Sequence, residues 1–234
     1  MNRIGVIVTT KEEILRICDH TVLRTDAPFS EIAENCRLAI RFNCASMCLA
    51  PAHVYEAKKF CGGKLKICTV IGFPNGYNDT ATKVFEARHM IEEGADEIDA
   101  VINIGWANSG MYAAIEDELM QLRRAAEGTI LKIIVETCKL SEPTLREICR
   151  VVSNSGADFI KTSTGFAERG ATVRDVEIMR EECAPETKIK AAGGISSFED
   201  AELLVKAGAD RLGTSRLVKL MLNEAKDTKN SLTY

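Results

Sequence analysis

The sequence predicts a single α/β domain, a (β/α)8 TIM barrel with a short extra helix near its N-terminus. Short apolar runs alternate with amphipathic stretches about eight times without a linker, and this alternation requires a parallel sheet. The chain has 234 residues, and one barrel commonly takes about 200–250 residues. The phrase Gly-Ala-Asp recurs at three predicted helix-to-strand junctions, at residues 94–96, 156–158 and 208–210. An open, doubly wound sheet is the alternative fold, but no Gly-x-Gly-x-x-Gly motif follows the first predicted strand.

The individual elements follow from hydrophobic periodicity and from residues that begin or end helices. Ser30 predicts the start of the second helix, Asn78 opens a long fourth helix, and Gly62 with Gly63 ends the third. Strands are expected near residues 18–23, 46–49, 66–73, 97–102, 129–136, 159–161, 188–191 and 211–213. Helices are expected near residues 11–17, 31–42, 53–60, 78–94, 111–126, 143–154, 173–182 and 198–207, with a last one from residue 215.

Composition excludes several classes of function. The net charge of −4 argues against nucleic acid or an anionic membrane as the main partner. No stretch approaches the ~20 apolar residues of a membrane span. The nine cysteines are odd in number and form no Cys-x-x-Cys pair, so buried thiols in a reducing cytoplasm are the simplest interpretation. We expect the barrel to span residues 1–225 and the polar residues 226–234 to form a flexible tail. Tyr234 could just reach the barrel mouth, but a disordered end is the simpler expectation.

Two predicted strands end on lysine, Lys161 on the sixth and Lys190 on the seventh. Groups at the C-terminal ends of barrel strands gather at one mouth, and adjacent strands lie roughly 4.8 Å apart. A single strand-end lysine is usually a solvated rim charge, but two neighbouring ones indicate chemistry. Each positive charge should lower the pKa of its neighbour, and partial desolvation should lower it further. A neutral lysine near pH 7 is what imine formation needs.

Acidic residues occur beside these lysines in the predicted interior. Asp99 lies within an apolar strand, where alternation would place Asp99, Val101 and Asn103 on the inner face. The structural interpretation is an ion pair with a lysine, and the functional one is a proton shuttle; the two are compatible. Asp19 is a similar but weaker case, and the adjacent His20 is more typical of a hydrogen-bonded core histidine than of a base.

The alternation of side chains leaves one question open. If Lys190 faces inward, Lys188 shares its side, as Lys132 and Glu136 share theirs on the fifth strand. Either the lower layers of the barrel hold buried ion pairs, or the seventh strand starts after Lys188.

The loops after the seventh and eighth strands predict an anion site. Gly193 and Gly194 follow one strand, and Gly213 with Ser215 follows the next and opens a helix. Loops at these positions, with a helix N-terminus, form the recurrent phosphate site of this architecture. Arg216 could add charge to the bound anion or lie on the surface.

These segments together resemble the deoxyribose-phosphate aldolase family. The matching motifs come in the family's order and span about residue 19 to about residue 216. They are Asp19-His20-Thr21, Gly72-Phe73-Pro74-Asn75-Gly76, Glu97-Ile98-Asp99-Ala100-Val101-Ile102-Asn103-Ile104-Gly105, Val135-Glu136-Thr137-Cys138, Lys161-Thr162-Ser163-Thr164-Gly165-Phe166, Lys190-Ala191-Ala192-Gly193-Gly194-Ile195 and Arg211-Leu212-Gly213-Thr214-Ser215.

The resemblance implies a class I aldolase that cleaves 2-deoxy-D-ribose 5-phosphate to D-glyceraldehyde 3-phosphate and acetaldehyde in deoxyribonucleotide catabolism. Lys161 would form the Schiff base, Lys190 would keep it neutral, and Asp99 would move protons through a bound water. No cofactor or metal is implied, and a homo-oligomer, dimer or tetramer, is expected. The substrate site would be lined by Asp19, Thr21, Cys48, Gly165, Gly193, Gly194, Ser215 and Arg216.

The chain departs from the family pattern where Arg216 replaces a frequent serine, where Leu49-Ala50 replaces Val-Asn, and where Ala167 replaces glycine. None of these changes removes a catalytic group. Two other functions are weighed against the aldolase. A phosphosugar isomerase would use a carboxylate base without an imine, and a non-catalytic barrel would bind a phosphorylated metabolite without turning it over.

Overall fold

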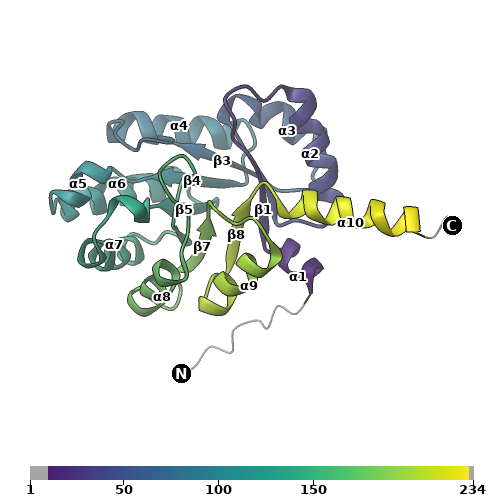
Figure 1. The fold of residues 1–234 in the computed structure, drawn as a ribbon. Coiled ribbons are helices and arrows are strands. Elements are labelled where there is room, and N and C mark those ends of the chain that lie inside the picture. The colour runs from purple at the N-terminus through teal and green to yellow at the C-terminus, as the bar shows by residue number, and fades with distance from the viewer. Residues whose placement is uncertain (1–9, 232–234) are drawn as a thin grey trace.

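The computed structural model describes residues 10–231, with the backbone alone for residues 225–231. Eight parallel strands close into a barrel in the order β1 to β8, and the helices surround it (Figure 1). The predicted (β/α)8 fold is confirmed. The strands are β1 (Cys18–Val22), β2 (Ser46–Leu49), β3 (Ile67–Ile71), β4 (Glu97–Val101), β5 (Ile130–Ile134), β6 (Phe159–Lys161), β7 (Lys188–Ala192) and β8 (Arg211–Thr214).

The helices fill the connections between strands, and the short extra helix α1 precedes β1 as predicted. The α-helices are α1 (Lys11–Arg16), α2 (Phe29–Arg41), α3 (Val54–Cys61), α4 (Thr80–Glu92), α5 (Ile104–Asn108), α6 (Tyr112–Ala125), α7 (Glu142–Asn154), α8 (Val173–Glu182), α9 (Phe198–Ala207) and α10 (Leu217–Ser231). Two short 3₁₀ helices are η1 (Pro51–His53) and η2 (Thr137–Lys139). Within the described residues, no helix is long and apolar enough to cross a membrane.

Three local predictions were wrong. Ser30 does not cap α2, because the helix already begins at Phe29 after Pro28, whose φ of −75° suits a helix start. Asn78 does not open α4; the Asp79 carboxylate accepts the N–H of Thr82 and caps that helix. Asn103 does not face the barrel interior: β4 ends at Val101, and the Asn103 side chain caps α5, which the sequence analysis missed.

The apolar core lies between the barrel and its helices. Alternate strand residues such as Ile98, Ile133 and Ile189 face outward and are fully buried against the helix layer. The opposite side chains of the same strands fill the barrel, where Asp99 and Lys132 are also fully buried. Barrel interiors are usually filled by branched apolar residues, so the charged interior here indicates a functional site.

The predicted tail falls partly on helix α10. The helix backbone continues to Ser231, whereas Tyr234 lies outside the described residues. The domain boundary at residue 225 and the mobility of the tail stay predictions.

Candidate active site

Lys161 and Lys190 lie side by side at the C-terminal end of the barrel, as expected from their positions on adjacent strands. They are directly paired in the register of β6 and β7. Both are buried, with exposed fractions of 3% and 1%. Asp99 Oδ2 accepts both amines, at 2.8 Å from Lys161 Nζ and 2.7 Å from Lys190 Nζ. One carboxylate oxygen therefore joins the two predicted catalytic lysines.

A second layer of charge lies deeper in the barrel. Lys132 Nζ is 2.8 Å from Asp99 Oδ1 and 2.5 Å from a Glu97 carboxylate oxygen. Arg211 donates to Asp19 Oδ1 at 2.6 Å, and Lys190 also pairs with Asp19. The interior network thus contains Lys132, Lys161, Lys190 and Arg211 as cations and Asp19, Glu97 and Asp99 as carboxylates.

The structure answers the question raised by alternation. Lys188 belongs to β7 but lies exposed at its first position, with Nζ 5.6 Å from the centre of the Phe159 ring. Lys132 is fully buried inside the barrel, so the lower layer does contain buried ion pairs. Glu136 follows the end of β5 and takes a left-handed backbone conformation with φ of 52°.

The pKa values of the network show which groups stay charged. Burial would raise the pKa of Asp99, but Lys132, Lys161 and Lys190 hold it well below its ordinary value. Burial would also raise the pKa of Asp19, but nearby cations, Lys190 most strongly, lower it below its ordinary value. Burial lowers the pKa of Lys190, yet Asp19 and Asp99 outweigh it and raise that pKa above its ordinary value. The expectation that Lys190 would have a lowered pKa was wrong, because it faces two carboxylates.

Three other predicted residues have distinct surroundings. Thr21 lines the mouth and donates its hydroxyl to the Asp19 carbonyl at 2.8 Å. Cys48 faces inward on β2, directly beside Cys68 in the register with β3, and is fully buried. Its Sγ lies within 4.8 Å of Cys68 Sγ and of an Asp99 carboxylate oxygen, and Cys48 is not among the residues that line the cavity at the mouth. His20 faces outward, with Nε2 2.8 Å from Asn35 Oδ1, and is the core histidine expected.

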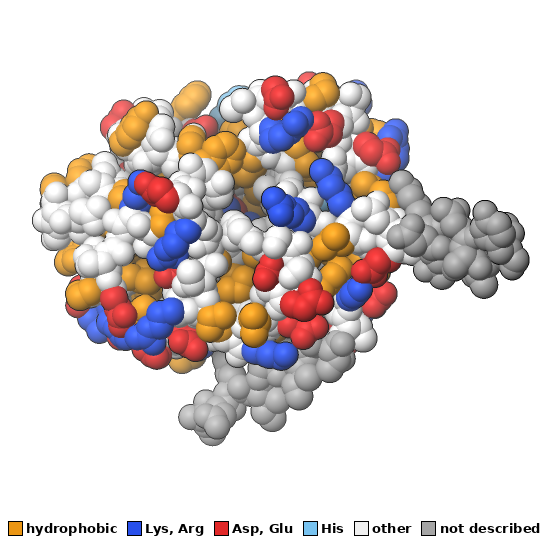
Figure 2. All heavy atoms as spheres, in the orientation of Figure 1, with side chains coloured by type: hydrophobic (Ala, Val, Ile, Leu, Met, Phe, Trp, Pro, Cys, Tyr) orange, Lys and Arg blue, Asp and Glu red, His pale blue; other side chains and the backbone are white. Residues whose placement is uncertain are grey.

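The mouth contains a cavity of about 590 Å³ that reaches Lys161. The face drawn in Figure 2 is hollowed near its middle, with Lys and Arg side chains at the edge. The structure brings together around this cavity the predicted residues Thr21, Lys161, Gly165, Gly193, Gly194, Ser215 and Arg216.

Close backbone packing explains the glycines on one side of the cavity. A Cβ at Gly170 would lie 2.1 Å from the Gly193 carbonyl oxygen, and a Cβ at Gly193 would lie 3.0 Å from Gly170 Cα. The loops after β6 and β7 can approach this closely only without side chains. Gly165, Gly193 and Gly194 also have positive φ angles, which expose backbone N–H groups to an anion in such loops.

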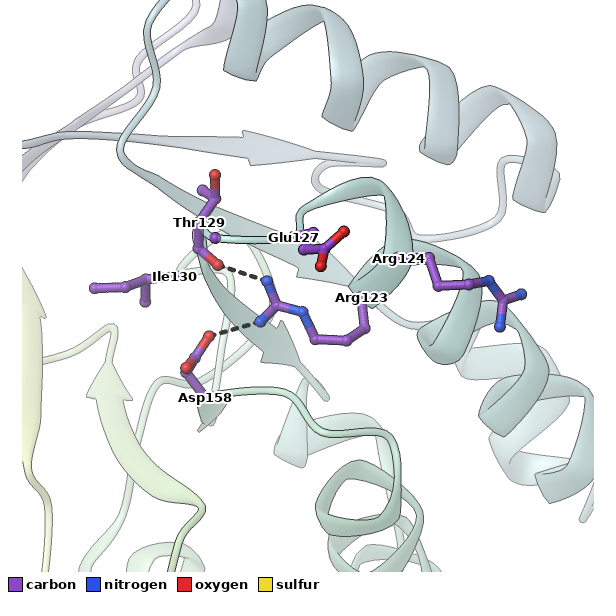
Figure 3. A pocket seen from close by; sticks show the side chains of 7 residues that line it. Arg123, Arg124, Glu127, Thr129, Ile130 and Asp158 are labelled. Carbon is purple, nitrogen blue, oxygen red and sulfur yellow. Dashed lines mark hydrogen bonds and ion pairs between the residues drawn. The ribbon is translucent and has the colours of Figure 1, made fainter.

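A second hollow, of about 550 Å³, lies at the opposite end of the strands. Figure 3 shows Arg123 extended between Thr129 and Asp158. Its guanidinium donates to Asp158 Oδ2 at 2.8 Å and to the Thr129 carbonyl at 2.7 Å. Ile130 is the first residue of β5 and Asp158 directly precedes β6, so the hollow lies at the end of the barrel away from the mouth, where active sites of this architecture are found. Because Arg123 already binds these two acceptors, the hollow is a structural junction.

Two groups of side chains in the described part of the chain have donor atoms close enough to hold a metal ion. They are Cys48 with Cys68 and Asp99, and Asp19 with Cys68 and Glu97, each within 4.8 Å. Lys132 Nζ already lies 3.3 Å from Cys68 Sγ and 2.8 Å from Asp99 Oδ1. A lysine ammonium therefore occupies the place that a cation would take.

Several residues of the site were missed or underrated by sequence reasoning. Sequence reasoning named Arg211 and Glu97 only as members of family motifs. Arg211 lies two positions before Gly213 on β8, and Glu97 lies two positions before Asp99 on β4, so each faces the same side of its strand as a residue that was assigned to the site. Alternation along the strand was thus the signal available. Alternation also put Glu136 on the side of Lys132, but its left-handed backbone conformation beyond the end of β5 had no signal in the sequence.

Comparisons with known proteins agree with this geometry. The family model described as DeoC/LacD family aldolase matches residues 14–215. A deoxyribose-phosphate aldolase of Streptococcus pyogenes serotype M4 (strain MGAS10750) is 51% identical over 217 residues, which is 93% of this chain and 97% of that protein.

Solved structures give the same result. A deoxyribose phosphate aldolase from Aeropyrum pernix, described as a unique tetrameric structure, superimposes with a TM-score of 0.86 at 30% identity, covering 92% of both chains. Orotidine 5'-phosphate decarboxylase from Pyrococcus horikoshii OT3 superimposes with a TM-score of 0.62 at 17% identity, covering 88% of this chain and 99% of that one. The second likeness concerns the barrel fold alone.

Proposed function

Because this chain belongs to the DeoC/LacD aldolase family, it is a carbon–carbon lyase, and we propose that it cleaves 2-deoxy-D-ribose 5-phosphate through a Schiff base on Lys161. The products are D-glyceraldehyde 3-phosphate and acetaldehyde, and the role is in deoxyribonucleotide catabolism. The observation that carries the residue assignment is the shared Asp99 oxygen, 2.8 Å from Lys161 Nζ and 2.7 Å from Lys190 Nζ at the barrel mouth.

Charge balance supports Lys161 as the nucleophile. With every group ionised, the network has the four cations Lys132, Lys161, Lys190 and Arg211 against the three carboxylates Asp19, Glu97 and Asp99. Loss of one proton would leave three of each. Lys161 lines the cavity, whereas Lys190 and Lys132 have raised pKa values because carboxylates outweigh the effect of burial. Lys161 is therefore the amine of the network that is placed to reach a carbonyl carbon in the cavity.

The reaction follows from this arrangement. The neutral Lys161 amine attacks C1 of the open-chain sugar, and loss of water gives a protonated imine. The C3 hydroxyl loses its proton and the C2–C3 bond breaks, so that its electron pair forms an enamine with the iminium carbon. Protonation at C2 and hydrolysis of the imine release acetaldehyde. Asp99 and Lys190 hold the protons beside these atoms, and Asp99 passes them through a bound water.

The phosphate would bind at the other side of the mouth. Gly165, Gly193 and Gly194 present backbone to the cavity, and Ser215 precedes the N-terminal end of α10. Arg216 lines the same cavity and supplies positive charge. Asp19 acts indirectly, since it is fully buried and holds Lys190 and Arg211.

Reductive trapping tests the assignment. Borohydride added with substrate should fix a covalent adduct, and peptide mapping should place it on Lys161. A coupled assay should detect acetaldehyde from the wild-type protein and none from Lys161→Ala. An isomerase would interconvert the sugar without an adduct, and a non-catalytic barrel would be stabilised by substrate without releasing acetaldehyde. If Lys161→Ala kept most of its activity, the mechanism would be wrong.

We also propose a homo-oligomer, a dimer or tetramer, that works in the cytoplasm. A relative 30% identical to this chain is described as tetrameric, and all nine cysteines are free thiols, as in reducing compartments. Light scattering of the purified protein and fractionation of its cells test these two points. A monomer, or recovery outside the cytoplasm, would contradict them.

A further inference from the structure

Glu136 is a buried carboxylate at the barrel mouth that the reaction as described does not use. It is 3% exposed and follows β5 in a left-handed conformation, with φ of 52° and ψ of 66°. Residues other than glycine, asparagine and aspartate rarely adopt this backbone conformation, and those that do cluster at functional sites. Its carboxylate faces the loop that follows Lys161 on the neighbouring strand.

Both oxygens of the Glu136 carboxylate bind one residue of that loop, and the Cys138 thiol also donates to Oε1 at 3.9 Å. The Thr164 N–H lies 3.3 Å from each of the two carboxylate oxygens, and the Thr164 hydroxyl donates to Oε2. The same hydroxyl oxygen accepts the N–H of Phe166 at 3.0 Å. Thr164 and Phe166 are therefore both held, and the residue between them, Gly165, is fixed from either side.

Gly165 is the part of this loop that faces the anion site. It lines the cavity, and its nitrogen lies 3.7 Å from the position a Cβ would take on Gly193. The Gly165 N–H donates no hydrogen bond to another group within residues 10–231. A glycine with φ of +86° has wide conformational freedom, so its N–H points in one direction only if its neighbours are held.

The far end of the loop is fastened separately. Arg169 and Thr137 both donate to Asp175 Oδ2, and the Ala171 N–H donates to the Ala192 carbonyl at 3.1 Å. The loop is thus anchored beyond Gly165 by ion pairs and backbone bonds. Glu136 supplies the anchor on the near side.

We propose that Glu136 is a positioning residue for phosphate binding: it holds Thr164 so that the Gly165 N–H is aimed at the phosphate of the substrate. The proposal rests on the proposed function for the identity of that substrate. Glu136 itself does not touch the ligand, because both of its oxygens bind Thr164. Preorganised donors bind an anion more tightly than donors that must first be ordered.

Kinetics with and without the phosphate provide the test. Glu136→Ala should raise KM for 2-deoxy-D-ribose 5-phosphate by about tenfold or more, the usual range for loss of a charged hydrogen-bonding partner, with kcat nearly unchanged. Its kcat/KM for unphosphorylated 2-deoxy-D-ribose should equal that of the wild-type protein. The KM of Glu136→Gln for the phosphorylated sugar should lie between those of Glu136→Ala and the wild-type protein, because its amide oxygen still accepts the Thr164 N–H. Equal losses on both sugars would overturn the proposal.

Two further variants keep the test decisive. Glu168→Ala is the matched control, since Glu168 lies on the same loop and binds Lys139 and the Cys138 thiol but not, among the described residues, Thr164. It should behave as wild type. If Glu136→Ala does not fold, Thr164→Val removes the hydroxyl alone and should raise KM for the phosphorylated sugar selectively. An unchanged KM in Thr164→Val would then contradict the proposal that Glu136 positions Gly165 through Thr164.

A binding measurement separates this proposal from the proposed function. Inorganic phosphate should raise the Tm of the wild-type protein and of Glu168→Ala, and should raise that of Glu136→Ala by less than half as much. Acetaldehyde, which carries no phosphate, should be trapped on Lys161 equally in all three. A wild-type protein that released no acetaldehyde would contradict the aldolase assignment. Equal increases in Tm with phosphate in all three proteins would contradict only the role of Glu136.

Discussion

The barrel interior and the layer beneath helices α4 and α6 both bury lysines, but the two regions differ in how those lysines are partnered. Outside the barrel, Lys83 donates to Glu118 Oε1 at 2.7 Å and to the Val101 carbonyl at 2.9 Å. Thr80 donates to the other Glu118 oxygen at 3.0 Å. Both side chains of the pair are completely buried. One cation faces one carboxylate, and each oxygen of that carboxylate has a donor.

The interior is not balanced in this way. Cations outnumber carboxylates there by one, and the Oδ2 atom of Asp99 serves two lysines at once. Glu97 has ion-pair contacts with Lys132 and Arg211, but its carboxylate oxygens accept no hydrogen bond from the described residues. Burial dominates at Lys83 and lowers its pKa, whereas carboxylates dominate at Lys190 and raise its pKa. A saturated pair stabilises the fold, and an unsaturated cluster beside a cavity can exchange protons.

The largest expected effect comes from removing the shared carboxylate. Asp99→Asn should lower kcat by about 10²–10⁴-fold, the usual contribution of a positioned proton-transfer group. The two lysines would also lose the anion that holds them 2.7–2.8 Å from one oxygen. Steady-state kinetics on the folded variant, checked by circular dichroism, measure this. A variant with wild-type kcat would show that Asp99 is only a structural partner.

The corresponding change in the saturated pair should act on stability. Glu118→Gln leaves Lys83 buried without its counter-charge, which typically costs about 3–5 kcal/mol in the free energy of unfolding. Its kcat should stay within about twofold of wild type, because Glu118 faces the helix layer and not the cavity. Urea unfolding and kinetics on the same preparation separate the two effects. A large fall in kcat without loss of stability would contradict the comparison.

Acid should weaken the interior network through its carboxylates. The pKa of Asp19 is lowered in the folded protein because its lysine and arginine partners outweigh burial, so it contributes stability above its unfolded pKa of about 3.9. That contribution is lost as the pH falls below about 4. Asp19→Asn should therefore lose less free energy of unfolding than wild type between pH 6 and pH 3, by about 1 kcal/mol. Parallel slopes from urea midpoints measured across this range would show that Asp19 is not the linked group.

Sequence reasoning recovered the features that depend on order along the chain. Alternating apolar and amphipathic stretches determined the barrel, and consecutive strands made Lys161 and Lys190 neighbours. Alternation within β4 placed Asp99 inside. These inferences hold because strand pairing and side-chain direction are local and periodic.

Features that depend on depth or on distant partners were not predictable. Arg211 binds Asp19, which is 192 residues away in sequence, and closure of the barrel alone brings them together. Lys83 and Glu118 look like ordinary solvated positions of helices in the sequence. Periodicity gives the side that a residue faces but not its distance from the end of the strand, and this is why Lys188 stayed ambiguous.

Lys188 and Lys190 provide the smallest and most direct test of this last point. They share one side of β7, but Lys188 is exposed at the strand start and Lys190 is 1% exposed beside Asp19 and Asp99. Within the described residues, the contact that Lys188→Met removes is the cation–π contact with Phe159, worth about 0.5–1 kcal/mol at an exposed site. Its kcat/KM should match wild type, because the change lies at the end of the barrel opposite the mouth.

Lys190→Met is the matched variant on the same strand, and it removes a buried cation that two carboxylates share. It should lower both kcat and the free energy of unfolding, because Asp19 and Asp99 each lose a partner. Kinetics and urea unfolding of the two variants in parallel measure the difference. If Lys188→Met impaired catalysis as strongly as Lys190→Met, position along the strand would not separate the reactive lysines from the structural ones. The activity would then have to depend on the total positive charge of β7.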